Sequence, residues 1–125
     1  MMTNLILTKT KNTLGVNFDA TTGVLDLTGS SYPENTTEFF KPLIDWIQKY
    51  FLEITGKLIL NIKIDYLNSS SIKYLSDIVD KLENYNKSGG AVEINWYHKE
   101  DDEDIREMGE EIKEDVKFTF NIISE

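Results

Sequence analysis

Three consecutive hydroxyl side chains, Ser69, Ser70 and Ser71, lie between an alternating apolar stretch and a new apolar period in the segment YLNSSSIK. Serine and asparagine side chains often cap helices, because their oxygens accept hydrogen bonds from the free amides of the first turn. One cap needs only one such residue, such as Asn68. The remaining hydroxyls would lie at the positive end of a helix, where a phosphate is stabilised and Lys73 could reach it. The segment therefore indicates a capped helix start that could also act as a phosphorylation switch.

His98, the only histidine, raises a second kind of chemistry. If it lay near the serines, it could activate one of them as a nucleophile, with Asp65 or Asp101 orienting the imidazole ring. The segment lacks the G-x-S-x-G elbow, however, and nothing marks an oxyanion hole. A single histidine at a strand end is usually only a polar residue, so a small Ser/His hydrolase is an alternative hypothesis.

Acidic residues cluster at positions 100–104, in the run EDDED. The glycine and the distal glutamate of an EF-hand loop are missing, and the first turn of a helix favours acidic side chains. The chain also has no P-loop, dinucleotide fingerprint or zinc-ligand spacing. We therefore expect no metal, nucleotide or other cofactor.

The composition limits the partners of the protein. The chain has 125 residues, 40% of them hydrophobic, and no linker-like run, which predicts one domain spanning residues 1–125. Its formal net charge of -9 opposes binding to nucleic acid and to anionic membranes, and favours a basic partner. No cysteine, signal peptide or apolar span is present, so membrane insertion is not expected and the cytoplasm is the default location.

Hydrophobic periodicity predicts strands and helices in alternation. Alternating apolar and polar residues predict strands at 57–67, 92–97 and 118–122, with shorter strands at 5–7, 14–18 and 25–27. In the first of these, Tyr66 falls on the apolar face. Helical apolar stripes occupy 39–51, 72–82 and 105–116, with Pro42 blurring the start of the first helix.

This order predicts a two-layer α/β domain with a mixed sheet. Helices that alternate with strands imply parallel crossovers, and the alternating strand pattern implies one face open to water, with all three helices on the other. Strand-to-helix loops then emerge at the carboxyl edge of the sheet, the usual place for sites in open α/β folds. The loops at 29–35, 67–71 and 96–104 should form one surface.

Three segments carry a family resemblance over nearly the whole chain: GSSYPENTTEFFKPLIDWI, YLNSSSIKYLSDIVDKLE and INWYHKEDDEDIREMGEEIKED. They resemble the SiaC family of bacterial regulatory phosphoproteins. The resemblance implies a fold like that of STAS domains of the anti-sigma-factor-antagonist type. It also implies a regulatory hydroxyl at the start of the helix that follows a central strand.

The resemblance further implies the partners of that hydroxyl. In this family, a threonine or serine after the Y-L-N asparagine is phosphorylated by a Ser/Thr kinase of histidine-kinase-like fold and dephosphorylated by a PP2C-type phosphatase. The unmodified protein activates a diguanylate cyclase, which links the switch to cyclic di-GMP and biofilm formation. In this chain the acceptor falls on Ser69, with Ser70 and Ser71 as alternates.

The hypothesis is therefore a non-enzymatic phospho-switch that acts by exchanging partners. The predicted partner-binding residues lie in the three loops and, for Lys73, just after the second: Tyr32, Pro33, Glu34, Asn35, Asn68, Lys73, His98, Asp101 and Asp102. Besides the hydrolase, a structural module that dimerises through the polar sheet face is a further alternative.

Overall fold

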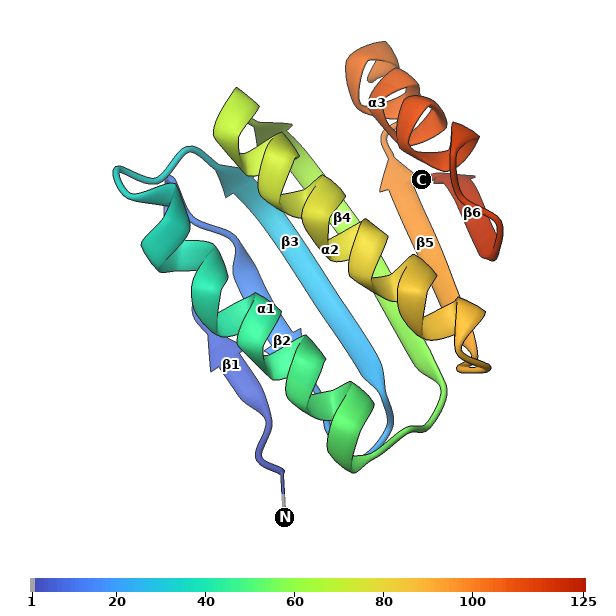
Figure 1. Cartoon of the computed structure of the whole chain (residues 1–125). Coiled ribbons are helices and arrows are strands. Elements are labelled where there is room, and N and C mark those ends of the chain that lie inside the picture. Colours follow the sequence, from blue (N-terminus) through green and yellow to red (C-terminus); the bar gives the residue numbers. More distant parts are fainter. Residues whose placement is uncertain (1) are drawn as a thin grey trace.

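Six strands form one mixed sheet in the computed structural model, which describes residues 2–125 (Figure 1). The order of the strands in the sheet follows their order in the chain. β1, β2 and β3 pair antiparallel, and β3, β4, β5 and β6 pair parallel. The strands are β1 (Leu5–Leu7), β2 (Gly15–Phe18), β3 (Val24–Ser31), β4 (Leu58–Leu67), β5 (Val92–His98) and β6 (Thr119–Ser124). The predicted mixed sheet is confirmed.

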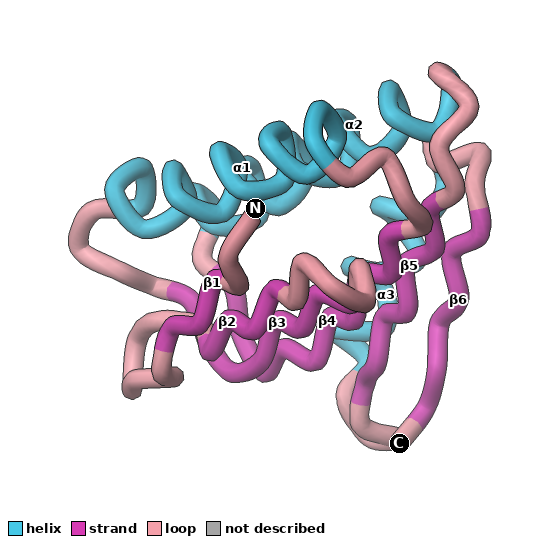
Figure 2. The backbone as a smooth tube through the Cα atoms, turned by 90° about the horizontal axis from the view of Figure 1, so that it is seen from below, coloured by secondary structure: helices cyan, strands magenta, loops and turns pink. Residues whose placement is uncertain are grey.

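Three helices connect the parallel strands: α1 (Thr36–Glu53), α2 (Ser69–Lys87) and α3 (Glu103–Glu114). α1 and α2 cover one face of the sheet (Figures 1 and 2). α3 lies on the same face, as predicted, since it is bonded to Trp96, which is buried on that face. The strand order explains this arrangement, because crossovers that share one hand and advance in one direction place every helix on one side. Among residues 2–125, no helix is both long enough and apolar enough to cross a membrane.

Two differences from the predicted boundaries, at β3 and at α1, affect the loop between them. β3 continues to Ser31, so the first part of the predicted loop 29–35 belongs to the strand. α1 begins at Thr36, three residues before the predicted start, because the Asn35 side chain caps it by accepting from the Glu38 amide at 3.0 Å. Pro42 lies inside the helix on its exposed side, and α1 continues through it.

The core lies between the sheet and the helices. Leu58, Leu60 and Ile62 of β4 are fully buried beneath them. Trp96 of β5 holds α3 in place, since its indole N–H donates to the Ile105 carbonyl at 2.9 Å. Gly109 allows this close approach, because a Cβ at that position would lie 2.5 Å from the indole ring.

The opposite face of the sheet is polar and open to water, as predicted. Asp26, Asn61, Asn95 and Asn121 lie side by side on four adjacent strands. Each asparagine amide donates to the carbonyl or carboxylate oxygen of its neighbour, at 3.0, 3.0 and 2.9 Å along the row. These bonds satisfy the polar side chains within the face itself.

Candidate functional site

The three strand-to-helix loops lie at the same edge of the sheet, at the top of Figure 1. The strands before these loops end at different heights along the sheet. Trp96 pairs with Ile62, so His98 at the end of β5 lies near Ile64, while β4 runs on to Leu67. At about 3.3 Å per residue, the start of α2 projects roughly 7 to 10 Å beyond the end of β5. The ends of β3 and β4 therefore form the foremost part of this edge.

The three serines at the start of α2 have three different environments. Ser71 is fully buried, and its hydroxyl is 2.7 Å from that of Ser31, which is also buried. Ser70 is exposed, and its hydroxyl lies 2.8 Å from the Thr36 hydroxyl, which ties the starts of α1 and α2 together. Ser69 is exposed, and its hydroxyl has no hydrogen-bond partner among the described residues. Only Ser69 therefore presents a hydroxyl that is both accessible and unengaged.

The start of α2 suits a negative charge. Asn68 caps the helix by accepting from the Ser71 amide at 2.9 Å, which leaves the amides of Ser69 and Ser70 without an acceptor in the described chain. The first turn contains no acidic residue, unlike the first turns of α1 and α3. Lys73 is exposed one turn further along the helix. Free amides, the helix dipole and this lysine together favour an anion at Ser69.

A β-bulge beside the serines corrects the predicted orientation of Tyr66. The register of β3 and β4 shifts so that Gly29 pairs with Ile64 but Ser30 pairs with Tyr66, leaving Asp65 as the extra residue. A bulge of this kind turns the following side chain to the other face. Tyr66 is therefore 53% exposed instead of joining the core. Its ring meets that of Tyr32 edge-on, with 6.0 Å between centroids.

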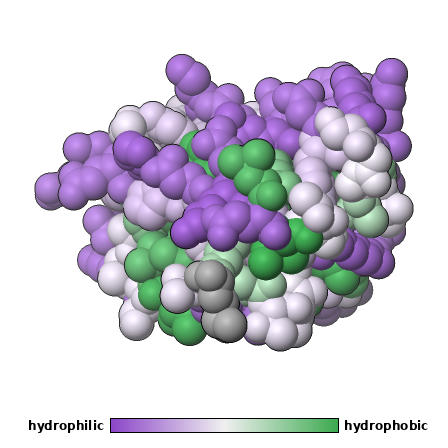
Figure 3. Space-filling view, turned by 60° about the horizontal axis from the view of Figure 1, so that its bottom comes forward, coloured by the Kyte–Doolittle hydropathy of each residue, from purple (hydrophilic) through white to green (hydrophobic). Residues whose placement is uncertain are grey.

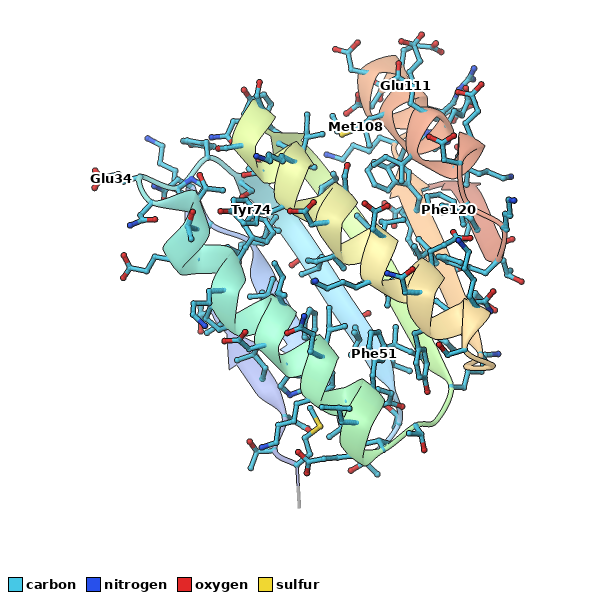
Figure 4. The ribbon with its side chains drawn as sticks, in the orientation of Figure 1. Glu34, Phe51, Tyr74, Met108, Glu111 and Phe120 are labelled. Atoms are coloured by element: carbon cyan, nitrogen blue, oxygen red, sulfur yellow. The ribbon has the colours of Figure 1, made fainter. Side chains whose placement is uncertain are left out.

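The remaining residues of the β3–α1 loop differ in solvent exposure and in whether their side chains are hydrogen-bonded. Tyr32 is 40% exposed, and Glu34 lies at the tip of the loop and points away from the molecule (Figure 4). Pro33 is half-buried between them. The Asn35 side chain is occupied by the α1 cap. We define the junction surface as Tyr32, Glu34, Tyr66 and Ser69, the exposed side chains at the ends of β3 and β4.

A fourth loop at this edge was missed in the sequence. Residues 8–14 join β1 to β2 and end beside the carboxyl end of β3, where the Tyr32 amide donates to the Asn12 carbonyl at 2.9 Å. The Lys9 side chain covers Gly29, whose φ is 95° and whose Cβ, if present, would lie 2.6 Å from the lysine Cδ. The hairpin pattern at 14–27 could have revealed this loop, because antiparallel pairing brings the start of β2 to the end of β3.

The residues predicted around β5 are set back from the junction surface. His98 is only 8% exposed, and its Nδ1 lies 2.9 Å from the Lys99 carbonyl. Asp102 caps α3 by accepting from the Ile105 amide at 3.1 Å, and Asp101 is exposed beside it. A salt bridge of 3.7 Å between Lys99 and Asp65 joins this loop to β4.

The hydrolase alternative finds no support in this geometry. Within residues 2–125, no hydrogen bond links the His98 imidazole to a serine hydroxyl, and the Asp65 carboxylate pairs with a lysine instead of the imidazole. The described residues also contain no group of three or more His, Cys, Asp or Glu side chains that could hold a metal ion. The edge presents exposed aromatic side chains and, at Ser69, one accessible hydroxyl.

The opposite edge, where the parallel strands begin, holds a hollow of about 580 Å³ between the ends of α1 and α2. Phe51 stacks on Tyr85 there, with 4.1 Å between ring centroids. Leu52 and Ile54 are exposed nearby, and Figure 3 shows separate apolar patches among polar residues on this side. None of the predicted site residues lies at this edge.

Comparisons with known proteins agree with the resemblance. A family model described as SiaC family regulatory phosphoprotein matches residues 7–125. An uncharacterised protein of Pseudomonas aeruginosa strain UCBPP-PA14 is 36% identical over 121 residues, which cover 97% of this chain and 96% of that protein.

Two crystal structures show the same fold. The structure of apo-SiaC from Pseudomonas aeruginosa matches with a TM-score of 0.92 and 36% identity, covering 98% of this chain and 99% of that one. In the structure of the diguanylate cyclase SiaD in complex with its activator SiaC, from the same organism, the match has a TM-score of 0.94 and 36% identity. It covers 97% of this chain and 99% of that one.

Proposed function

Because this chain belongs to the SiaC family of regulatory phosphoproteins, we propose that it is a non-enzymatic switch controlled by reversible phosphorylation of Ser69. In this proposal, the unmodified protein binds and activates a diguanylate cyclase in the cytoplasm. A Ser/Thr kinase of histidine-kinase-like fold and a PP2C-type phosphatase set the state of Ser69. The output is cyclic di-GMP synthesis and biofilm control. The related SiaC, which is the activator in the complex with SiaD, supports the choice of partner.

One observation carries the choice of residue. Of the three serines, only Ser69 has a hydroxyl that is exposed and makes no hydrogen bond with the described residues. A kinase must reach the acceptor hydroxyl from solvent and free it from existing contacts. Ser71 fails the first condition because it is buried, and Ser70 is bonded to Thr36. Ser69 is therefore the preferred acceptor.

The physical effect of the phosphate is opposite in the free protein and in the complex. In the free protein, the amides of Ser69 and Ser70, the helix dipole and Lys73 stabilise the added charge of about -1.5 to -2. In the complex, the same charge must lose water beside the exposed rings of Tyr32 and Tyr66. An unpaired charge that is desolvated in an interface costs about 2 to 5 kcal/mol. Phosphorylation should therefore release the partner.

The decisive experiment titrates the purified diguanylate cyclase of the source organism with wild type, Ser69→Ala and Ser69→Asp, and measures both affinity and cyclic di-GMP production. We expect Ser69→Ala to bind and activate like wild type, because the Ser69 hydroxyl has no recorded bond to lose. Ser69→Asp should weaken binding toward the lower end of about 30- to 5,000-fold, because aspartate carries less charge than phosphate.

Ser88→Asp is the matched control. Ser88 is exposed at the other end of the same helix, so the variant has the same net charge as Ser69→Asp without a charge at the junction surface. Equal affinity of Ser69→Asp and wild type for the cyclase would contradict the switch. Phosphate incorporation by the kinase into Ser69→Ala, located by mass spectrometry, would move the acceptor to another residue.

A further inference from the structure

An apolar groove of about 650 Å³ runs between α2 and α3, on the face of the molecule that carries the helices. Half-buried or buried aliphatic side chains and one methionine form its floor: Ile72, Val79, Met108, Ile112 and Val116. In Figure 4, Met108 lies between the two helices. The groove is separate from the junction surface in its lining, since none of the four junction residues contributes to it.

The groove exists because α3 packs against the sheet and not against α2. α1 and α2 are in direct contact, with Phe40 stacked on Tyr74 at 5.4 Å between centroids. α2 and α3, in contrast, make little direct contact. The hydrogen bond and close packing of Trp96 against α3 keep that helix above β5. The space between α2 and α3 is therefore not filled by another element of the described chain.

The rim of this groove is strongly acidic. Six carboxylates from both walls line it: Asp80, Glu83, Asp104, Glu107, Glu111 and Asp115. None of the six forms a salt bridge with another residue of the described chain. The only basic side chains that line the groove are Lys87 and Lys117. Most of the negative charge along the rim is therefore not neutralised.

We propose that this groove is a docking site for a basic amphipathic helix of a partner protein. A helix with one apolar face fits an apolar floor between two helices, and its lysines and arginines would face the carboxylates on both walls. The lining residues run along α3 from Asp104 to the C-cap Asp115, a length of about 17 Å, which suits about three turns of helix.

A second copy of this chain does not suit the groove. A symmetric dimer would place the same acidic surface on both sides, and like charges across an interface oppose association. The net charge of -9 adds to that repulsion. An anionic membrane surface is excluded by the same argument.

A negative charge at Ser69 should raise the affinity of the groove for a basic helix, whereas it should lower the affinity of the junction surface for the cyclase. This consequence rests on the proposed function. Ser69 is on the same face of α2 as Ile72, Ser76 and Asp80, at helical spacings of three, seven and eleven residues. A negative charge there has the same sign as the rim. At about 10 Å in water, one charge contributes only about 0.4 kcal/mol, which is less than a twofold change in affinity. Ser69→Asp should therefore slightly strengthen helix binding in the groove.

The test uses a fluorescein-labelled peptide of about 14 residues, with leucines on one helical face and lysines and arginines on the other. Fluorescence anisotropy at about 0.15 M NaCl measures its affinity, with a scrambled peptide of the same composition as control. We compare Asp80→Lys/Glu111→Lys, which reverses one charge on each wall, with Asp77→Lys/Glu114→Lys. Asp77 and Glu114 are exposed on the same two helices but do not line the groove.

We expect Asp80→Lys/Glu111→Lys to lower the affinity for the peptide about 10- to 100-fold, and Asp77→Lys/Glu114→Lys to lower it about threefold or less. Both double variants change the net charge equally, so a difference between them reports the position of the charges. Met108→Ala should also weaken binding, whereas Leu52→Ala, an exposed leucine elsewhere, should not. If a charge reversal disturbs folding, the comparison of Met108→Ala with Leu52→Ala tests the docking site instead. Equal losses for both charge pairs, equal affinity for the scrambled peptide, or a dimer that Asp80→Lys/Glu111→Lys dissociates would overturn the proposal. Failure of Ser69→Asp to affect the cyclase would leave this result unchanged, so the two proposals fail separately.

Discussion

The three adjacent serines at the start of α2 have three different structural environments. Ser71 belongs to the core, where it bonds to Ser31 of the neighbouring strand. Ser70 joins the starts of two helices through Thr36. Ser69 faces solvent beside free amides. Their different roles follow from the helix, because successive residues point about 100° apart around its axis.

Ser71→Ala should lower the free energy of unfolding without removing the phosphorylation site. The substitution leaves the buried Ser31 hydroxyl without its partner, which costs about 1 to 3 kcal/mol. Ser69→Ala, at an exposed position, should change stability by less than about 0.5 kcal/mol. Urea unfolding monitored by circular dichroism measures both. A Ser71→Ala protein as stable as Ser69→Ala would contradict the role given to this hydrogen-bonded pair.

At the scale of the elements, the turn between α1 and β4 fixes the far ends of two helices. The Tyr50 hydroxyl donates to the Lys57 carbonyl at 2.9 Å, and the Tyr85 hydroxyl donates to the Gly56 carbonyl at 2.6 Å. Burial raises the pKa of both tyrosines above the usual value of 10.0, and the proximity of Tyr85 raises the pKa of Tyr50 further. Both bonds require the neutral phenol.

These pKa shifts predict a loss of stability in alkali. Below pH 10 both tyrosines are neutral in the folded and the unfolded chain, so their contribution is fully present. As the pH rises above 10, the unfolded chain ionises first, and the contribution is lost progressively up to the raised pKa of the folded state. Urea unfolding at pH 8 and pH 11 should show a smaller difference for Tyr50→Phe and Tyr85→Phe than for wild type. An unchanged difference in both variants would show that these tyrosines do not control the alkaline limb.

α3 is the element that shapes the groove, although it buries the fewest side chains of the three helices. Only Ile105 and Gly109 are buried along it. Its position depends on Trp96. The indole ring packs closely against Gly109, and its N–H donates to the Ile105 carbonyl. The side of α3 that faces α2 is left uncovered, and it carries the acidic rim.

At the scale of the whole molecule, the charge distribution separates two surfaces. Ser69 lies at a helix start with no acid in its first turn, whereas the α2–α3 groove is lined by six carboxylates. A partner that must exclude phosphate and a partner that carries a basic helix can therefore recognise different parts of one small protein.

Folding should need no metal ion or other cofactor. The described residues contain no cluster suited to a metal, and the core is a continuous hydrophobic cluster between one sheet and three helices. The melting temperature should therefore be the same with and without EDTA. A metal ion that binds only the folded state would raise the free energy of unfolding by RT ln(1 + [L]/Kd), so its removal by EDTA would lower the melting temperature. A drop in melting temperature with EDTA that magnesium or calcium restores would refute this expectation.

The sequence by itself determined the order and type of the elements and much of the candidate site. Apolar periodicity is a property of each segment, so it correctly located every strand and helix, with boundaries uncertain by a few residues. The preference of asparagine and serine for helix starts marked residues 68–71 as the capped start of a helix, and the order of parallel strands indicated that the three loops would share an edge. The family blocks indicated the regulatory class.

Only the tertiary structure decided which side chains are available. The predicted burial of Tyr66 was wrong because the bulge at Asp65 depends on how β3 and β4 pair, which neither strand encodes alone. The three serines are equivalent in the sequence, and their burial depends on Ser31 and Thr36, which lie 34 to 40 residues away. The α2–α3 groove arises because Trp96 holds α3 apart from α2. Each of these features is set by contacts between distant segments, and periodicity within one segment carries no information about them.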